Sequence, residues 1–182
     1  MLYIVRHGKT EMNSLGVLNG RTDDKLCDEG AQMAIEAGEK LKKVRFDTVF
    51  VSPLSRTQDT AKYILSRNLY PVCLTEDERI IEREIGAYTG KRYEEMSLEM
   101  RKNFYALDFT AEEYGIESTR SLVERGKDFI EFLRKNYAGK NVLVVTHNGI
   151  LRAIRYALGE KAVDGNIGIL GVDNATVLSY EL

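Results

Sequence analysis

The chain has 182 residues, of which 43% are hydrophobic and 30% are charged, and its formal net charge is −2. This length is typical of one domain with a substantial core, and the plentiful hydrophobic residues argue against disorder. The balance of 26 basic against 28 acidic residues argues against a dedicated nucleic-acid binder. The two cysteines, Cys27 and Cys73, indicate neither a disulfide framework nor a zinc finger.

Targeting and membrane signals are weak at the start of the chain. The apolar residues 2–5 follow Met1 directly, and Arg6 interrupts them before the hydrophobic core of a signal peptide can form. Apolar runs elsewhere are far shorter than the roughly 18 residues that predict a membrane-spanning helix. We therefore expect a cytoplasmic protein with neither a membrane nor a nucleic acid as partner.

Predicted strands and helices alternate along most of the chain. In chain order we expect a strand at 2–5, a helix at 31–44, a strand at 48–51, a helix at 54–68, a strand at 72–74, a helical stretch near 93–103, a helix at 121–137, a strand at 142–145, a helix that follows Asn148 and Gly149 and reaches about residue 158, and a strand at 176–180. The strands are continuous apolar runs, which are typical of a parallel sheet covered on both faces. The sequence thus predicts an α/β fold, a three-layer α/β/α sandwich around a mostly parallel sheet, in one domain over residues 1–182.

Polar residues follow three of these strands, and they include the only two histidines. The three segments are Arg6-His7-Gly8, Ser52-Pro53-Leu54-Ser55-Arg56 and Thr146-His147-Asn148-Gly149. Because the carboxyl ends of parallel strands form the ligand crevice of such a sheet, neighbouring strands would bring two imidazoles and two guanidiniums together. One such residue alone is more often structural, but the four together suit a phosphoryl group, since arginine offers a planar fork and histidine can act as a nucleophile.

The sequence around these strand ends resembles that of a known protein family. Residues 2–13, Leu-Tyr-Ile-Val-Arg-His-Gly-Lys-Thr-Glu-Met-Asn, are similar to the signature of the histidine phosphatase superfamily, the phosphoglycerate mutase-like proteins. Further segments match in the family's order: 19–30, 51–61, 82–90, Glu117 with Arg125, and 146–149. The resemblance covers nearly the whole chain and implies a phosphoglycerate mutase-like fold.

The resemblance also implies roles for individual residues. His7 corresponds to the nucleophile that becomes phosphohistidine, and Glu82 to the general acid, although Glu84 lies only two residues away. The residues implied to bind the substrate phosphate are Arg6, Arg56, His147, Asn13 and Gly20. No metal and no other cofactor is needed for this chemistry, and a homodimer is consistent with the family.

The implied activity is metal-independent hydrolysis of a small phosphomonoester. Mutases of the family are longer, whereas here residues 91–116 form only a small helical lid, which favours water over a second hydroxyl as acceptor. The alternatives are a phosphoglycerate mutase, a non-catalytic phospho-ligand regulator and, less in keeping with the lid, a phosphatase of phosphohistidine proteins.

The resemblance to the family does not identify the substrate. Lys9, Met12 and Val17 depart from residues common in the family, which bears on specificity rather than on activity. The tyrosines of the lid region either face the substrate or pack within the lid; they are Tyr88, Tyr93, Tyr105 and Tyr114.

Overall fold

The computed structural model describes all residues from Met1 to Leu182. One five-stranded sheet, in the order β3-β2-β4-β1-β5, forms its centre. The strands are β1 (Leu2–Arg6), β2 (Thr48–Val51), β3 (Leu74–Glu76), β4 (Val142–Thr146) and β5 (Val177–Tyr180). All neighbouring pairs are parallel except β1 with β5, which is antiparallel. The predicted mostly parallel sheet is therefore confirmed.

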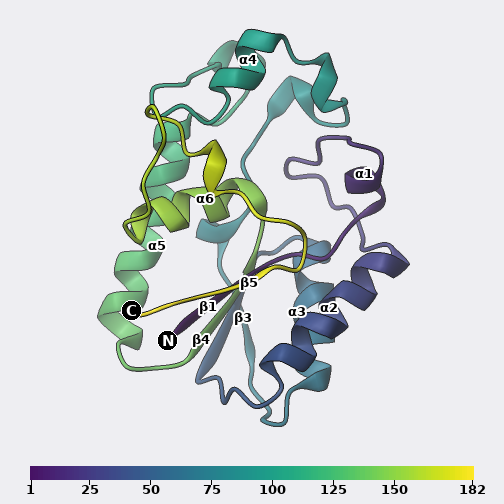
Figure 1. Cartoon of the computed structure of the whole chain (residues 1–182), viewed down its shortest axis with the longest axis vertical. Helices are drawn as coiled ribbons and strands as arrows, with labels where there is room; N and C mark the ends of the chain where they lie inside the picture. The colour runs from purple at the N-terminus through teal and green to yellow at the C-terminus, as the bar shows by residue number, and fades with distance from the viewer.

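Helices cover both faces of the sheet. On one face lie α2 (Asp28–Leu41) and α3 (Ser55–Arg67), and on the other α5 (Thr119–Tyr137) and α6 (Asn148–Ala157) (Figure 1). Each face has its own apolar cluster, one packed under α5 and α6 and the other under α2 and α3. The continuous apolar strands are thus buried on both sides, as in other parallel sheets, and the three-layer sandwich is confirmed.

The register of the sheet brings the three polar strand ends to one edge. The central strand β4 pairs with β1 on one side and with β2 on the other. Arg6 lies opposite Thr146, and Val51 lies opposite Val145. His7, Ser52 and His147 therefore leave the sheet at the same level, because each follows directly after one of these paired positions.

Residues 91–116, which we call the cap, lie beyond this edge of the sheet (Figure 1). They contain the turns η3 (Tyr93–Glu95) and η4 (Glu112–Tyr114) and the short helix α4 (Leu98–Asn103). Together with Ile85, the cap residues Met96, Phe104, Ala111 and Ile116 form a small apolar cluster of their own. The predicted small helical lid is present, and it packs on itself and on the loop that holds Glu82.

Several predicted boundaries were wrong. The strand expected at 72–74 spans Leu74–Glu76 instead, because pairing with β2 starts only where Leu74 lies opposite Val49. The helix expected at 31–44 begins at Asp28 and ends at Leu41. The helical stretch near 93–103 is divided, because the Ser97 side chain caps a new helix by accepting a hydrogen bond from the Met100 amide.

Two further features complete the fold. The one-turn helix α1 (Glu11–Ser14) was not predicted; Thr10 and Asn13 form a reciprocal capping box at its start. None of the helices combines the length and apolar character needed to cross a bilayer.

Candidate active site

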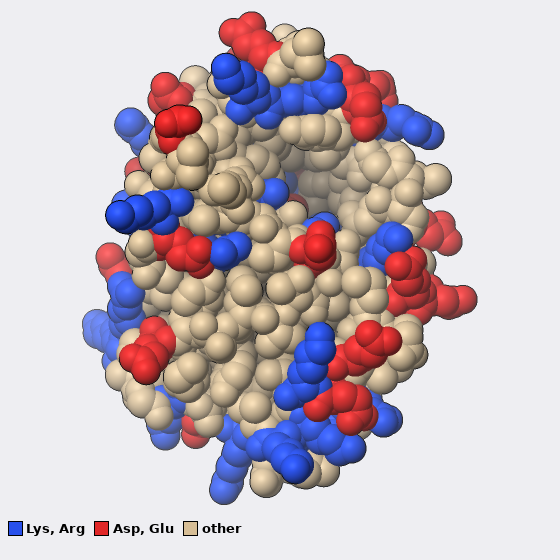
Figure 2. All heavy atoms as spheres, in the orientation of Figure 1, with Lys and Arg blue, Asp and Glu red and all other residues tan.

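A cavity of about 520 Å³ opens between the strand ends and the cap. Figure 2 shows it as a hollow in this face of the molecule, with basic side chains visible inside. Six of the seven predicted site residues line it: Arg6, His7, Asn13, Gly20, Arg56 and Glu82. The seventh, His147, is fully buried directly behind the lining. Residues from distant parts of the chain thus meet where the strand-end argument expected them.

His7 sits at the floor of the cavity with its ring orientation fixed. Its Nδ1 lies 2.7 Å from the carbonyl oxygen of Gly8, which can only accept, so Nδ1 carries the proton. The Nε2 lone pair is therefore free. Burial, followed by the positive charges of Arg56 and Arg6, lowers the pKa of His7 well below its usual value. The geometry thus presents a neutral imidazole with an available nitrogen.

His147 lies beside His7, with ring centroids 5.3 Å apart, but both of its nitrogens are occupied by the protein. The Arg56 Nε donates to His147 Nδ1 at 3.2 Å, so the ring proton lies on Nε2 and points to the Ser52 hydroxyl oxygen at 2.7 Å. Burial, followed by the charge of Arg56, lowers the pKa of His147 well below its usual value. In this arrangement His147 orients the Arg56 guanidinium from behind.

Arg56 is completely buried near the start of α3, and the loop around residue 20 holds it in place. Its Nη1 donates to the Thr22 carbonyl at 2.6 Å and its Nη2 to the Gly20 carbonyl at 2.8 Å. With Nε engaged by His147, one hydrogen on each terminal nitrogen is left for a ligand. Gly20 therefore holds the Arg56 guanidinium through its backbone carbonyl.

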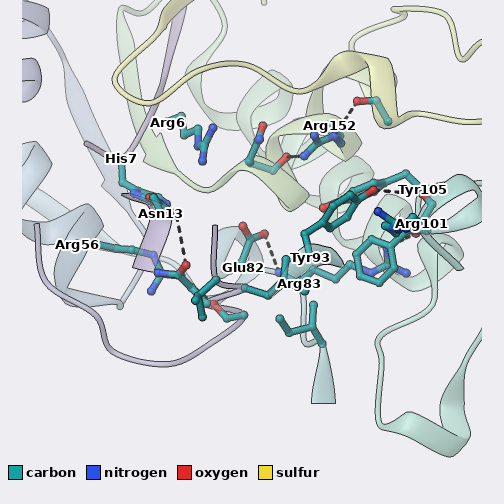
Figure 3. Close-up of a pocket in the computed structure, with 18 of the residues that line it drawn as sticks. Arg6, His7, Asn13, Arg56, Glu82, Arg83, Tyr93, Arg101, Tyr105 and Arg152 are labelled. Atoms are coloured by element: carbon teal, nitrogen blue, oxygen red, sulfur yellow. Dashed lines mark hydrogen bonds between the residues drawn. The ribbon is translucent and has the colours of Figure 1, made fainter. Parts of the chain in front are cut away.

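Arg6 approaches the same point from the end of β1. Its Nη1 donates to the Val172 carbonyl at 2.6 Å, while its Nε is buried without a partner. A buried donor without a partner is costly, and a bound anion would satisfy it. Asn13 lies nearby (Figure 3), and its side-chain amide donates to Asn19 at 3.2 Å, which leaves one amide hydrogen for a ligand.

Glu82 lines the cavity together with His7 (Figure 3) and is held at the amino end of α6. Its carboxylate accepts from the backbone amides of Arg83 at 2.8 Å and of Gly149 and Ile150, each at 3.2 Å. A Cβ atom on Gly149 would collide with the Glu82 carboxylate, so this approach requires glycine. Glu84 instead turns to the amides of Ile85 and Gly86 and does not line the cavity.

Other residues of the cavity were missed by the sequence argument. Arg83, Asn148, Arg152, Asn166 and the cap residues Arg101 and Lys102 all line it. Arg152 follows Asn148 by one helical turn, a spacing that places both on the same face of α6 and that could have indicated it. Of the four tyrosines, Tyr93 and Tyr105 line the cavity, whereas Tyr88 and Tyr114 pack on each other with ring centroids 5.8 Å apart.

The donor chemistry of the cavity suits an anion. Its only carboxylate is Glu82, against six basic side chains, and His7 and Glu82 are its only groups of the kinds that ligate metals well. No three His, Cys, Asp or Glu side chains gather anywhere in the molecule as a metal-binding group would. What the arrangement can do is bind a phosphoryl group between Arg6 and Arg56 and expose it to His7 and Glu82.

Comparison with known proteins places this chain among phosphatases and mutases. The family model described as the histidine phosphatase superfamily (branch 1) matches residues 2–182. A metal-independent phosphoserine phosphatase of Arabidopsis thaliana is 31% identical over 172 residues, covering 91% of this chain and 71% of that protein. A 2,3-bisphosphoglycerate-dependent phosphoglycerate mutase of Parvibaculum lavamentivorans is 27% identical, covering 100% of this chain and 90% of that protein.

A solved structure shows the same arrangement of elements. The phosphoserine phosphatase of Entamoeba histolytica, in a mutant form bound to phosphoserine, superposes with a TM-score of 0.79 and 25% identity over 97% of this chain and 87% of that one. The chain described here therefore belongs to the histidine phosphatase superfamily, branch 1, and is a phosphomonoester hydrolase.

Proposed function

We propose that the protein hydrolyses small phosphomonoesters without a metal ion, through a phosphoryl group carried covalently on Nε2 of His7. The observation that carries this proposal is the tautomer of His7: the Gly8 carbonyl holds the proton on Nδ1 and leaves Nε2 free inside the cavity. Its lowered pKa keeps the ring neutral at physiological pH, as a nucleophile must be.

In the first step, the Nε2 lone pair attacks phosphorus and forms a P–N bond, while the P–O bond to the leaving group breaks. The proton of the Glu82 carboxylic acid passes to the leaving oxygen, so the product is a neutral alcohol. Because the bound phosphoryl oxygens are negatively charged, Arg6 and Arg56 contribute mainly by electrostatic stabilisation of the transition state.

In the second step, a water molecule attacks the phosphorus of phosphohistidine and the P–N bond breaks. The Glu82 carboxylate, now without its proton, accepts one from the attacking water. Inorganic phosphate leaves, and His7 and Glu82 return to their starting states. The hydrogen bonds from Gly149 and Ile150 keep the carboxylate in position for both transfers.

The substrate class follows from the cavity and the relatives. A cavity of about 520 Å³ accommodates a metabolite rather than a folded protein surface. Two of the relatives carry names or ligands that refer to phosphoserine, which makes a phosphorylated amino or hydroxy acid a suitable first substrate to test. The small cap, residues 91–116, supports hydrolysis over transfer to a second hydroxyl. Cytoplasmic location, and assembly as a homodimer, stay predictions from the sequence.

Two experiments test this proposal. Purified protein should release phosphate from p-nitrophenyl phosphate in EDTA, and rapid quenching of turnover should trap acid-labile phosphate on His7. His7→Ala should lose at least about 10⁴-fold in kcat while the circular dichroism spectrum stays native. Strict dependence on added metal, or full activity of His7→Ala, would disprove the mechanism.

A separate assay distinguishes the alternative reaction. With 3-phosphoglycerate and 2,3-bisphosphoglycerate together, a mutase would form 2-phosphoglycerate faster than it releases phosphate. Release of phosphate without isomerisation supports the hydrolase. A protein that binds phosphate but neither transfers nor releases it would instead be a regulator.

A further inference from the structure

The loop that leads into β5 contacts the site residues from outside the cavity. Because β5 pairs antiparallel with β1, the residues just before β5 lie next to those at the end of β1. In this loop, residues 172–175, the Ala175 amide donates to the carbonyl oxygens of Arg6 at 3.0 Å and His7 at 3.2 Å. No residue of the 172–175 loop lines the cavity. The loop therefore supports the site without being part of its surface.

The 172–175 loop is held in an unfavourable backbone shape by its contacts with β1. The Val172 carbonyl accepts from the Arg6 guanidinium at 2.6 Å. Ala175 is buried and has φ +55°, a left-handed conformation that residues with a Cβ atom rarely adopt. Such a conformation persists only where the surrounding structure holds it, and it occurs most often near functional sites.

Asn174 makes the side-chain contacts of this loop with the site. Its Nδ2 lies 3.0 Å from the carbonyl oxygen of His7, 3.2 Å from Oδ1 of Asn13 and 3.4 Å from the carbonyl oxygen of Gly8. The two backbone carbonyls can only accept, so the NH2 group of Asn174 faces this point. With two hydrogens for three acceptors, one hydrogen is shared. A single amide thus joins three groups of the site.

The first consequence concerns the orientation of the Asn13 side chain. Its Oδ1 accepts from Asn174 and from the backbone amide of Thr10 at 3.3 Å, so both oxygen lone pairs are used. The Asn13 NH2 group therefore points away from them, with one hydrogen on Asn19 and the other free for a phosphoryl oxygen. The flipped amide would place NH2 against two donors and present an oxygen to the phosphoryl group, which would repel it.

The second consequence concerns the backbone at His7. The Gly8 carbonyl, which holds the proton on Nδ1 of His7 at 2.7 Å, is also an acceptor for Asn174. The His7 carbonyl accepts from both Asn174 and the Ala175 amide. Asn174 therefore restrains the two peptide groups that set where the His7 ring lies and which of its nitrogens is free.

We propose that Asn174 is a positioning residue for phosphoryl transfer. It keeps the donor side of the Asn13 amide turned toward the phosphoryl group, and it holds the backbone that orients His7. This inference rests on the proposed function and adds to it a residue that lies outside the cavity. Its loss should weaken phosphate binding and turnover in a protein that is still folded.

Replacement of Asn174 tests the proposal. Asn174→Ala loses both hydrogens, so the Asn13 amide can flip and the backbone at His7 is held less firmly. We expect kcat/KM for p-nitrophenyl phosphate to fall by about tenfold, and the inhibition constant of inorganic phosphate to rise by about three- to tenfold. Asn174→Ser keeps one donor on a shorter side chain and should lose less; it replaces Asn174→Ala if that variant fails to fold.

The matched control is Asn68→Ala, which removes the same kind of contact far from the site. Asn68 is also half-buried, and its Nδ2 donates to the carbonyl oxygens of Leu41 and Val44, each at 3.0 Å. This variant should unfold at a lower urea concentration but keep the kcat, the KM and the phosphate inhibition constant of the wild type. The control thus separates a positioning role from a contribution to stability alone.

A double-mutant cycle tests whether Asn174 acts through Asn13. In the Asn13→Ala background there is no amide left to orient, so Asn174→Ala should lower kcat/KM by a smaller factor than it does in the wild type. The loss that remains belongs to the contacts with His7 and Gly8. If the two substitutions multiplied independently, the coupling to Asn13 would be disproved.

The outcomes separate this inference from the function on which it rests. If the wild type does not hydrolyse p-nitrophenyl phosphate at all, the proposed function fails first. If it does, and folded Asn174→Ala keeps the wild-type kcat, KM and phosphate inhibition constant, the positioning role is disproved and the hydrolase stands. A change in stability alone, as expected of Asn68→Ala, would overturn the proposal in the same way.

Discussion

The two ends of the cavity are built in different ways. At the end next to the sheet, Arg6 ends β1, and His7 and His147 directly follow β1 and β4. Arg56 is fixed there by three hydrogen bonds to the protein. At the other end, Arg101 comes from a six-residue helix in a cap with a small cluster of its own. The Arg101 guanidinium contacts the Tyr93 ring, and its Nε has no hydrogen-bond partner; no backbone carbonyl holds it in place.

This difference suggests a division of tasks. Arg56 is buried and bonded to three other segments, so its replacement would disturb the structure around it. The cap has a small apolar cluster of its own, and its Tyr105 and Leu107 also pack against the main core. We therefore expect substitutions in the cap to alter substrate choice more than the reaction itself, as in many α/β enzymes.

The largest effect should come from the sheet end. Arg56→Lys keeps the charge but loses the fork that reaches Gly20, Thr22 and His147, so we expect kcat/KM to fall by about 10²–10³-fold for every substrate. Arg101→Lys, at the cap end of the cavity, should reduce kcat/KM much less, because the Arg101 side chain makes no hydrogen bond to the protein. Steady-state kinetics on p-nitrophenyl phosphate and phosphoserine compare the two. If both substitutions lowered kcat/KM equally, the two ends of the cavity would not differ in their contribution to catalysis.

The next effect concerns Glu82, which bridges the two ends. Glu82→Gln keeps the shape of the side chain but only one of the two oxygens that accept from Gly149 and Ile150, and it cannot donate a proton as an acid. We therefore expect kcat to fall by about 10²–10⁴-fold for alkyl phosphates. The loss should be smaller for p-nitrophenyl phosphate, whose leaving group needs no proton. The control is Glu84→Gln, which should keep most of the activity. If Glu84→Gln lost activity and Glu82→Gln kept it, Glu84 rather than Glu82 would be the general acid.

A glycine pair measures how firmly the cap is attached. Gly86 has φ +49°, and a Cβ there would collide with the backbone of Tyr114 and Gly115, so Gly86→Ala should cost about 1–3 kcal/mol of unfolding free energy. Gly90 has φ +78° but open space around it, so Gly90→Ala should cost only about 1 kcal/mol. Urea titrations of both variants check the difference; equal costs would mean that the contact of residue 86 with the cap is unimportant.

The smallest effect is a pH dependence from the two buried histidines. Because the folded-state pKa of both is lowered, the unfolded chain binds more protons once the pH drops below about 6.5. The free energy of unfolding should therefore decrease on acidification, by up to about 1.4 kcal/mol per pH unit for each histidine. His147→Asn should make this slope shallower in urea titrations between pH 7.5 and 5. If the free energy of unfolding depended on pH equally in the wild type and in His147→Asn, His147 would not contribute to the pH dependence.

The sheet end could be predicted from the sequence, and the cap end could not. Continuous apolar runs followed by Arg6-His7, Ser52 and His147 fixed both the strands and their convergence, because the parallel sheet imposes a common edge. Arg101 lies in a segment without periodicity, where only tertiary packing decides which side chains turn inward. His147 lies behind the cavity because its ring bonds Arg56 and Ser52, which are far away in the chain, and no local pattern encodes such contacts.

The unpaired basic groups also bear on how tolerant the molecule is of mutation. Six positive charges share one carboxylate, Glu82, in the cavity, so they repel one another when no ligand is bound and lower the stability of the protein. Neutral replacement of Arg101 or Lys102, whose side chains make no hydrogen bond to the protein, should then raise the melting temperature. Selection for stability and selection for catalysis would therefore oppose each other at these positions. Bound phosphate should raise the melting temperature, because it binds the folded state and reduces the repulsion.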